Sequence, residues 1–179
     1  MAHEPSLFPK KDAMTRREFM WLSSLAAAGL MTGCATNPVT GESQLMLVSE
    51  DQEVQIDRQY SPYQFSADYG TTQDKKLNDY IDRTGKKIAA RSHRTHMPYN
   101  FQVVNANYVN AYAFPGGSIA CTRGILLSLD NEAELAALLG HELGHVNARH
   151  TAEQMSKGML TQAVVGGLAA AAGTQGAFY

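Results

Sequence analysis

The segment 131–150 constrains this 179-residue chain most, because it joins a helix start signal to an apolar stripe and two histidines. Asn131, followed three residues later by Glu134, is a capping-box pattern that predicts a helix start. The apolar residues that recur at helical spacing along the segment are Leu135, Leu138, Leu139 and Val146. On such a helix, His141 and His145 lie on one face, about one turn apart.

The two histidines belong to the string His141-Glu142-Leu143-Gly144-His145, which is an HExxH motif. Both imidazoles can bind one Zn²⁺ ion at about 2.0–2.1 Å. Zinc lowers the pKa of a bound water toward about 7, and Glu142 can then take its proton. The alternative is an ordinary pair of histidines with Glu142 in a salt bridge. Gly144 is unfavourable inside a helix, which predicts close helix packing at that point.

Composition narrows the choice of function. The 15 Lys and Arg residues against 17 Asp and Glu residues give a net charge of −2, which argues against nucleic-acid binding. A hydrophobic fraction of 44% is sufficient for a packed core. The two cysteines lie far apart in the sequence and form no disulfide framework. Cys121 lies in an apolar stretch, which predicts a buried, inert thiol.

Residues 1–33 have the three-part organisation of an export signal. A basic region that contains Arg16 and Arg17 precedes an apolar stretch from Phe19 to Met31. The segment 15–20 resembles the twin-arginine export signature, which favours that route over the general one.

The small residues before Cys34 are typical of a lipoprotein cleavage site, so its thiol is predicted to carry a lipid. By resemblance to the sorting of such lipoproteins, the lack of an aspartate directly after Cys34 favours the outer membrane. We therefore predict a lipid-anchored protein of the bacterial envelope that faces the periplasm. The alternative is a short N-terminal helix packed on the core, with Cys34 an ordinary thiol.

The rest of the chain predicts a mixture of helices and short strands. Residues 34–48, rich in turn-forming types, predict a tether. A capping-box pattern at Ser49 predicts a helix to about Tyr60, before Pro62. The remaining predicted elements are a helix at 74–91, strands at 101–105, 108–114 and 118–122, a short helix or turn at 123–129, and a last helix at 151–172.

The segment Gly158–Gly173 is apolar except for Thr161 and Gln162, and it is short for a membrane span. We expect it to be a helix buried behind the histidine pair. A hairpin that touches the membrane near the lipid anchor is the alternative.

Three strings in the same order resemble the Ste-type (CAAX prenyl protease-like) zinc metallopeptidases. They are Asn110–Gly117, Thr122–Leu126, and His141–Val146 with its continuation to His150. Together with the segment 37–49, they are most similar to the periplasmic, lipoprotein-linked BepA-like branch of that family. The resemblance covers about residues 34–172.

This resemblance implies a mainly helical α+β fold at residues 49–179, of the gluzincin type, with a small sheet beside the HExxH helix. It also implies that a strand beside the cleft holds an extended peptide by backbone hydrogen bonds. The candidate substrate-binding residues are Asn110, Ala111, Tyr112, Ala113 and Phe114. A plain hairpin with no role in substrate binding is the alternative.

The family's third zinc ligand is a glutamate on a later helix, and this chain does not match it. Glu153 is the only acidic residue after His145, and it lies too near in sequence. We therefore expect the third ligand to be absent and the chain to be truncated at its C-terminus. His150 is a possible substitute, although five residues along a helix would turn it away from the histidine face.

The function implied by the resemblance is a zinc-dependent endopeptidase of the envelope, with one Zn²⁺ ion held by His141 and His145 and with Glu142 as the general base. Its substrates would be misfolded or misassembled membrane or exported proteins. Its partners would be polypeptides and the membrane, reached through the lipid anchor, with no nucleic acid. The alternative is a catalytically inactive, chaperone-like or scaffolding lipoprotein of the same fold.

Overall fold

The computed structural model describes residues 16–17, 20 and 34–171. The chain divides into two units, Met1–Gly33 and Cys34–Tyr179, and the second unit contains every element named below. Its fold is α+β and mainly helical, as the sequence predicted. Almost all of the predicted export signal lies outside the described residues.

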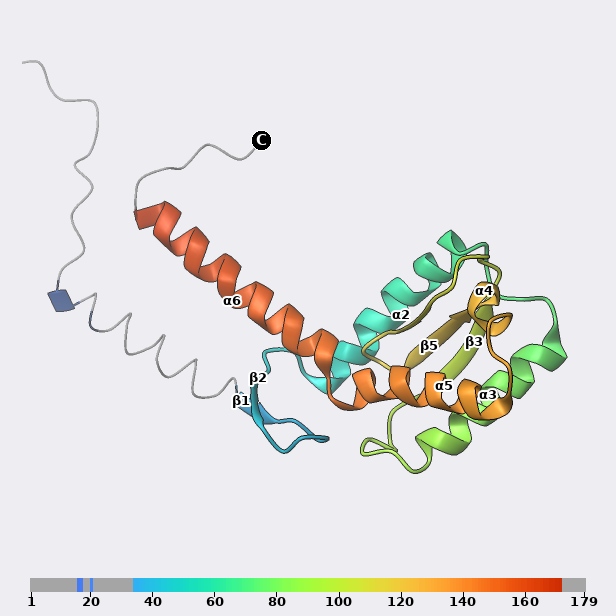
Figure 1. Ribbon diagram of the computed structural model, residues 1–179. Helices are drawn as coiled ribbons and strands as arrows, with labels where there is room; N and C mark the ends of the chain where they lie inside the picture. Colours follow the sequence, from blue (N-terminus) through green and yellow to red (C-terminus); the bar gives the residue numbers. More distant parts are fainter. Residues whose placement is uncertain (1–15, 18–19, 21–33, 172–179) are drawn as a thin grey trace, which may run out of the picture. The chain divides into compact units, whose positions relative to one another are not determined.

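The centre of the fold is a mixed sheet of β3 (Asn100–Val104), β4 (Ala111–Ala113) and β5 (Ser118–Thr122), in the order β3-β5-β4. Figure 1 shows β3 and β5 side by side, and their pairing is parallel, with Asn100 opposite Ser118. β4 pairs antiparallel with β5 and occupies an edge of this sheet. β4 is shorter than the strand predicted at 108–114, because only Ala111–Ala113 pair with β5.

Helix α2 (Glu50–Ala67) lies against one face of the sheet, where Phe65 packs with Val104 and Ala120. The expected end before Pro62 is wrong, since the helix continues through this proline. Pro62 is exposed, so the carbonyl that loses its partner lies on the solvent side. The side chains buried by the helix recur at every fourth position, at Glu53, Asp57, Ser61 and Phe65, and their packing extends the helix beyond the proline.

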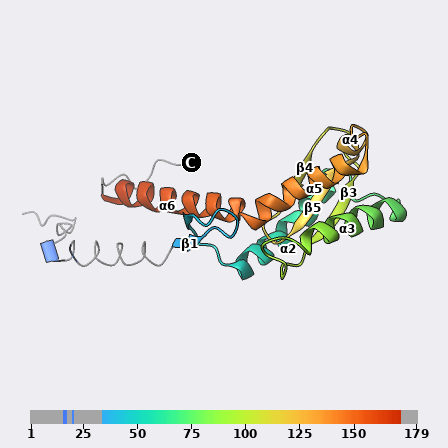
Figure 2. The same cartoon turned by 60° about the horizontal axis from the view of Figure 1, so that its bottom comes forward.

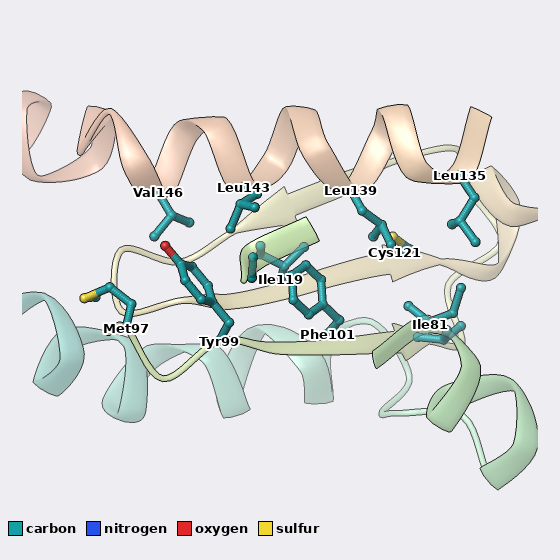
Figure 3. Close-up of a cluster of buried hydrophobic side chains, with 12 residues drawn as sticks. Ile81, Met97, Tyr99, Phe101, Ile119, Cys121, Leu135, Leu139, Leu143 and Val146 are labelled. Atoms are coloured by element: carbon teal, nitrogen blue, oxygen red, sulfur yellow. The ribbon is translucent and has the colours of Figure 1, made fainter. Parts of the chain in front are cut away.

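Helices α3 (Lys75–Ala89) and α5 (Glu132–Asn147) pack on each other and on the other face of the sheet. Figure 3 shows four α5 side chains directed at the strands, namely Leu135, Leu139, Leu143 and Val146. They meet Phe101, Ile119 and Cys121, all of which are almost fully buried. The short helix α4 (Arg123–Leu126) connects β5 to the loop before α5.

Residues 34–48 are not an irregular tether. They contain a hairpin of β1 (Cys34–Thr36) and β2 (Ser43–Leu45), which pair antiparallel. The buried side chains of Asn37 and Gln44 hydrogen-bond to each other and both donate to the carbonyl of Ala148. These bonds attach the hairpin to the end of α5. Hydrophobic periodicity could not predict them, because they are made by polar side chains.

Helix α6 (His150–Ala171) follows α5 as a separate helix (Figure 2). Its first turns are packed, since Ala152 and Ser156 are buried and the Ser156 hydroxyl accepts a hydrogen bond from the amide of Leu47. From 157 to 167 the side chains are exposed, except for the half-buried Leu160. The expected burial of this apolar segment is therefore wrong for those residues. Within the described part of the chain, no helix has the length and apolarity needed to cross a bilayer.

Candidate active site

Helix α5 presents the two histidines of the HExxH motif on the side opposite its apolar stripe, to which Leu143 belongs. The Asn131 side chain accepts a hydrogen bond from the amide of Glu134, which confirms the predicted helix start. The Leu139 and Leu143 side chains anchor the helix on the sheet. His141 and His145 are exposed, so both imidazoles are accessible to a ligand from solvent.

The two imidazoles converge. Their Nε2 atoms lie 3.2 Å apart, and the rings are nearly perpendicular, with centroids separated by 4.8 Å. Two ligands at 2.0–2.1 Å from a tetrahedral zinc ion are about 3.3–3.4 Å from each other. The spacing of His141 and His145 therefore fits two neighbouring positions in the coordination sphere of a zinc ion.

Glu142 lies between the histidines in sequence but faces inward, with an exposed fraction of 8%. Its negative charge contributes to the raised pKa of Cys121 on β5. Burial, and after it the charge of Glu142, raises the pKa of the Cys121 thiol to about 12. Cys121 has an exposed fraction of 0%, which confirms the predicted buried thiol.

The described residues bring two candidate metal ligands together, not a complete set. Among them, no group of three His, Cys, Asp or Glu side chains is arranged to hold a metal ion. Glu153 forms an ion pair with Lys157 at 2.7 Å. His150 lies beside His145, but it contacts Nδ1, the ring nitrogen that is not directed at His141.

His150 lies closer to the motif than the sequence predicted. A continuous helix would turn His150 away. The helix is interrupted between α5 and α6, however, and Arg149 has a positive φ of 58°. The break returns His150 to the histidine face, where its Nδ1 lies 2.8 Å from Nδ1 of His145. Sequence periodicity cannot reveal this contact, because it assumes an unbroken helix.

Strand β4 forms the wall beside α5. Ala111 and Ala113 pack toward the helix, whereas Tyr112 and Phe114 pack with Phe65 on the opposite face. A small pocket joins the end of β4 to the motif, and its lining includes Ala113, Phe114, Pro115, His145, Val146, Arg149 and Thr151. The side of β4 away from β5 pairs with no strand of the described chain. Of the candidate substrate-binding residues, Ala113 and Phe114 therefore lie beside His145.

Asp68 holds strand β4 in place, and no pattern in the sequence predicted this role. Its two carboxylate oxygens accept hydrogen bonds from the hydroxyls of Tyr108 and Tyr112, at 2.6 and 2.5 Å. Burial would raise the pKa of Asp68, but the hydrogen bonds from Tyr108, Tyr112 and Gln64 outweigh it and hold the pKa below its usual value. The α2 end is thereby fastened to the strand at the site.

The expectation for Gly144 is wrong. A side-chain carbon at this position would meet no atom within 4 Å in the described structure, so close helix packing does not explain the glycine. Of the other predicted functional residues, Cys34 is exposed in β1, and the residues just before it lie outside the described part.

A capped helix with two converging histidines and an adjacent glutamate, beside the edge of a small sheet, is the arrangement of the HExxH metallopeptidases. Comparison with known proteins gives the same class. Residues 75–178 match the sequence pattern of Peptidase family M48. The chain belongs to this family.

Several relatives are named "Beta-barrel assembly-enhancing protease". That of Yersinia pestis is 33% identical over 129 residues, which are 72% of this chain and 26% of the relative. That of Escherichia coli K12 is 31% identical over 120 residues, which are 67% of this chain and 24% of the relative. The "Mitochondrial metalloendopeptidase OMA1" of Arabidopsis thaliana is 30% identical over 156 residues, 83% of this chain and 30% of the relative. The chain thus spans about a quarter of the length of the two bacterial relatives.

Proposed function

We propose that this protein is a zinc-dependent endopeptidase of the bacterial envelope that hydrolyses misfolded or misassembled membrane or exported proteins. The observation that carries the proposal is the convergence of the His141 and His145 Nε2 atoms at 3.2 Å on the exposed face of α5. These two nitrogens would hold the zinc ion. When bound, zinc would polarise the scissile carbonyl and acidify a water molecule.

Glu142 is the proton carrier of the proposed reaction. Its carboxylate accepts a proton from the attacking water and returns it to the amine that leaves when the peptide bond breaks. The 8% exposure of Glu142 favours this role, because a partly desolvated carboxylate interacts more strongly with a nearby proton donor than an exposed one.

Substrate is proposed to bind as an extended strand along the outer edge of β4. The backbone of Asn110 and Phe114 already bonds to β5, and since the bonds of an antiparallel pair alternate, Ala111 and Ala113 present their backbone groups to the open edge. Hydrogen bonds to these groups do not depend on substrate sequence, which suits an enzyme that acts on unfolded chains. The anchoring of Tyr112 by Asp68 fixes the strand, so less conformational entropy is lost when a peptide pairs with it.

The finer assignment within the family is also a proposal. The strings at 110–117 and 141–150 support the Ste-type, gluzincin framing, and the similarity to two relatives named "Beta-barrel assembly-enhancing protease" supports a role in envelope protein quality control. The export signal at 1–33 and the lipid on Cys34 would place the protein on the periplasmic side of the envelope, at the outer membrane.

A catalytically inactive, chaperone-like or scaffolding lipoprotein is the second candidate. The outer edge of β4, which pairs with no strand of the described chain, is the observation that favours it. An inactive protein could still hold an extended peptide at the β4 edge.

A comparison of two variants tests the enzymatic proposal. Glu142→Gln keeps the size of the side chain and leaves both histidines in place, so zinc should still bind. Hydrolysis of a quenched fluorescent casein should fall by at least about 10²-fold, because the amide cannot accept the proton at neutral pH. His141→Ala should abolish both zinc binding and hydrolysis.

The matched control is His93→Ala, which removes an exposed histidine from another part of the fold. It should leave zinc content and hydrolysis unchanged. Normal hydrolysis by Glu142→Gln, or loss of zinc from it, would contradict the assigned role of Glu142. Zinc binding without any hydrolysis by the unmodified protein would favour the inactive alternative.

The export route has its own test. Replacing Arg16 and Arg17 together by lysine keeps the charge but removes the guanidinium pair of the twin-arginine signature. Export of the double variant should stop. Unchanged export would indicate the general route.

A further inference from the structure

The two ring nitrogens of His145 have different partners. Its Nε2 lies 3.2 Å from Nε2 of His141, on the side proposed for the metal. Its Nδ1 lies 2.8 Å from Nδ1 of His150, with the two ring centroids 5.0 Å apart. His145 is thus held between the histidine it pairs with in the motif and a histidine outside the motif.

The position of His150 depends on the interruption of the helix between α5 and α6. In one continuous helix, a residue five positions on is rotated by about 140° from His145. Helix α5 instead ends at Asn147, Arg149 takes a left-handed φ of 58°, and α6 begins at His150. A non-glycine residue in this conformation is unfavourable, so the surrounding structure must stabilise it.

That stabilisation comes from α2 and the segment before it. The Arg149 side chain donates from Nε to both carboxylate oxygens of Glu53 at 3.2 Å and from Nη2 to the carbonyl of Val48 at 2.8 Å. Glu53 is fully buried, and its distance from Arg149 in sequence is 96 residues. The start of α2 therefore holds Arg149 in the conformation that directs the next residue at His145.

We propose that His150 is a positioning residue for His145, fixed in place by the contact between Arg149 and Glu53. The inference rests on the proposed zinc site. A histidine that binds a metal through Nε2 carries its proton on Nδ1, and a hydrogen bond from that proton fixes the tautomer and the orientation of the ring. At 2.8 Å, Nδ1 of His150 accepts this hydrogen bond, and its own proton is then on Nε2.

The arrangement serves the site in two ways. It prepares the Nε2 lone pair of His145 before the metal arrives, and it orients the ring toward His141. Hydrogen-bond partners of metal-binding histidines commonly contribute about 10–100-fold to metal affinity. His150 does so from outside the HExxH string, without being a ligand itself.

Two substitutions at this position separate positioning from other roles. In His150→Asn, the amide oxygen takes the place of Nδ1 and keeps the acceptor. In His150→Phe, the ring remains but the acceptor is lost. His93→Phe, at an exposed histidine elsewhere, is the control for the change of residue type. Circular dichroism and thermal unfolding establish that each variant is folded.

The first measurement needs no metal. Two-bond ¹H–¹⁵N correlation spectra of the metal-free protein, recorded at a pH where the imidazoles are neutral, report which nitrogen of His145 carries the proton. We expect the Nδ1–H tautomer in the unmodified protein and in His150→Asn, and the Nε2–H tautomer in His150→Phe. An Nε2–H tautomer in the unmodified protein would overturn the positioning role, whether or not zinc binds.

The second measurement is zinc affinity, determined by competition with a chromophoric chelator. His150→Phe should weaken zinc binding by about 10–100-fold, and His150→Asn by only a few-fold. Equal losses in the two variants would overturn the proposal and indicate that His150 is itself a ligand. No loss in His150→Phe would also overturn it. If the unmodified protein failed to bind zinc, the proposed function would be contradicted. The spectra would then still show whether His150 holds His145 in the Nδ1–H tautomer.

Discussion

The guanidinium of Arg94 donates to the carboxylate of Glu53 at 2.7 Å, and the two side chains have exposed fractions of 2% and 0%. Arg94 also donates to the carbonyl of Val146, so one side chain connects the start of α2 to the end of α5. With Arg149 on the same carboxylate, three separate segments meet at Glu53. This buried ion cluster is linked to the C-terminal end of the histidine helix α5 through the hydrogen bond from Arg94 to Val146.

Glu53→Gln should therefore destabilise the protein strongly. The amide leaves Arg94 and Arg149 without their buried counter-charge, and breaking such a pair costs about 3–5 kcal/mol. Urea unfolding followed by circular dichroism measures the loss. The control is Lys75→Ala, which removes an exposed ion pair with Asp79 and should hardly move the unfolding midpoint. Equal effects of the two substitutions would show that the cluster contributes no special stability.

Two helix glycines should respond in opposite ways to alanine. At Gly85, a methyl group would overlap the ring of Phe101, which is 1% exposed and has no room to move. At Gly144 the methyl group would meet nothing within 4 Å. Gly144→Ala should stabilise the fold by up to about 1 kcal/mol through helix propensity, and Gly85→Ala should destabilise it by about 1–3 kcal/mol. Thermal unfolding of both variants checks the pair, and a stabilised Gly85→Ala would contradict the packing described for α3.

Asp68→Asn should alter the acid dependence of stability. A carboxylate whose pKa is lowered in the folded state contributes stability that is complete above its unfolded pKa and is lost as the pH falls through the folded value. At pH 7 the variant should be the less stable protein, and its deficit should shrink as the pH falls below about 4. Urea midpoints between pH 7 and pH 3 measure this. A deficit that stayed constant with pH would exclude the charge of Asp68 as its cause.

Cys34→Ala should remove the proposed lipid anchor. Without the thiol, we expect either an uncleaved precursor or a protein released into the soluble periplasmic fraction. Fractionation followed by immunoblotting distinguishes these outcomes from the membrane-bound form. Cys121→Ala is the matched control, because that thiol is buried in β5 and should not affect partitioning. Membrane association of a normally cleaved Cys34→Ala protein would disprove lipidation.

Local signals predicted much of the fold. The cap at Asn131 and the apolar stripe of α5 determined the histidine helix, and the strand at 118–122 was predicted with its observed bounds. These elements are governed by residues close to one another in sequence. Pro62 was misleading because a local helix breaker was overridden by the burial of Ser61 and the packing of Phe65 on the sheet.

The parts that could not be predicted depend on contacts between distant residues. The hairpin at 34–48 is attached in part by a hydrogen bond from Asn37 to Ala148, over 111 positions. The approach of His150 to His145 requires Arg149 to be held by Glu53, over 96 positions. No periodicity or capping rule connects such pairs, so the sequence predicted candidate metal ligands on one helix face but not the contacts that surround them.

The central position of β5 also has a consequence for the order in which the sheet assembles. β4 and β5 are joined by a tight turn in which Gly117 has a φ of 109°, and their paired residues Ala113 and Ile119 are close in sequence. The parallel partner of β5 must close a longer loop, from Asn100 to Ser118, so we expect the hairpin to form early and β3 to dock late. Gly117→Ala should then mainly slow refolding, whereas Val103→Ala should mainly accelerate unfolding, as stopped-flow measurements in urea would show. The reverse distribution would mean that the parallel pair forms the folding nucleus.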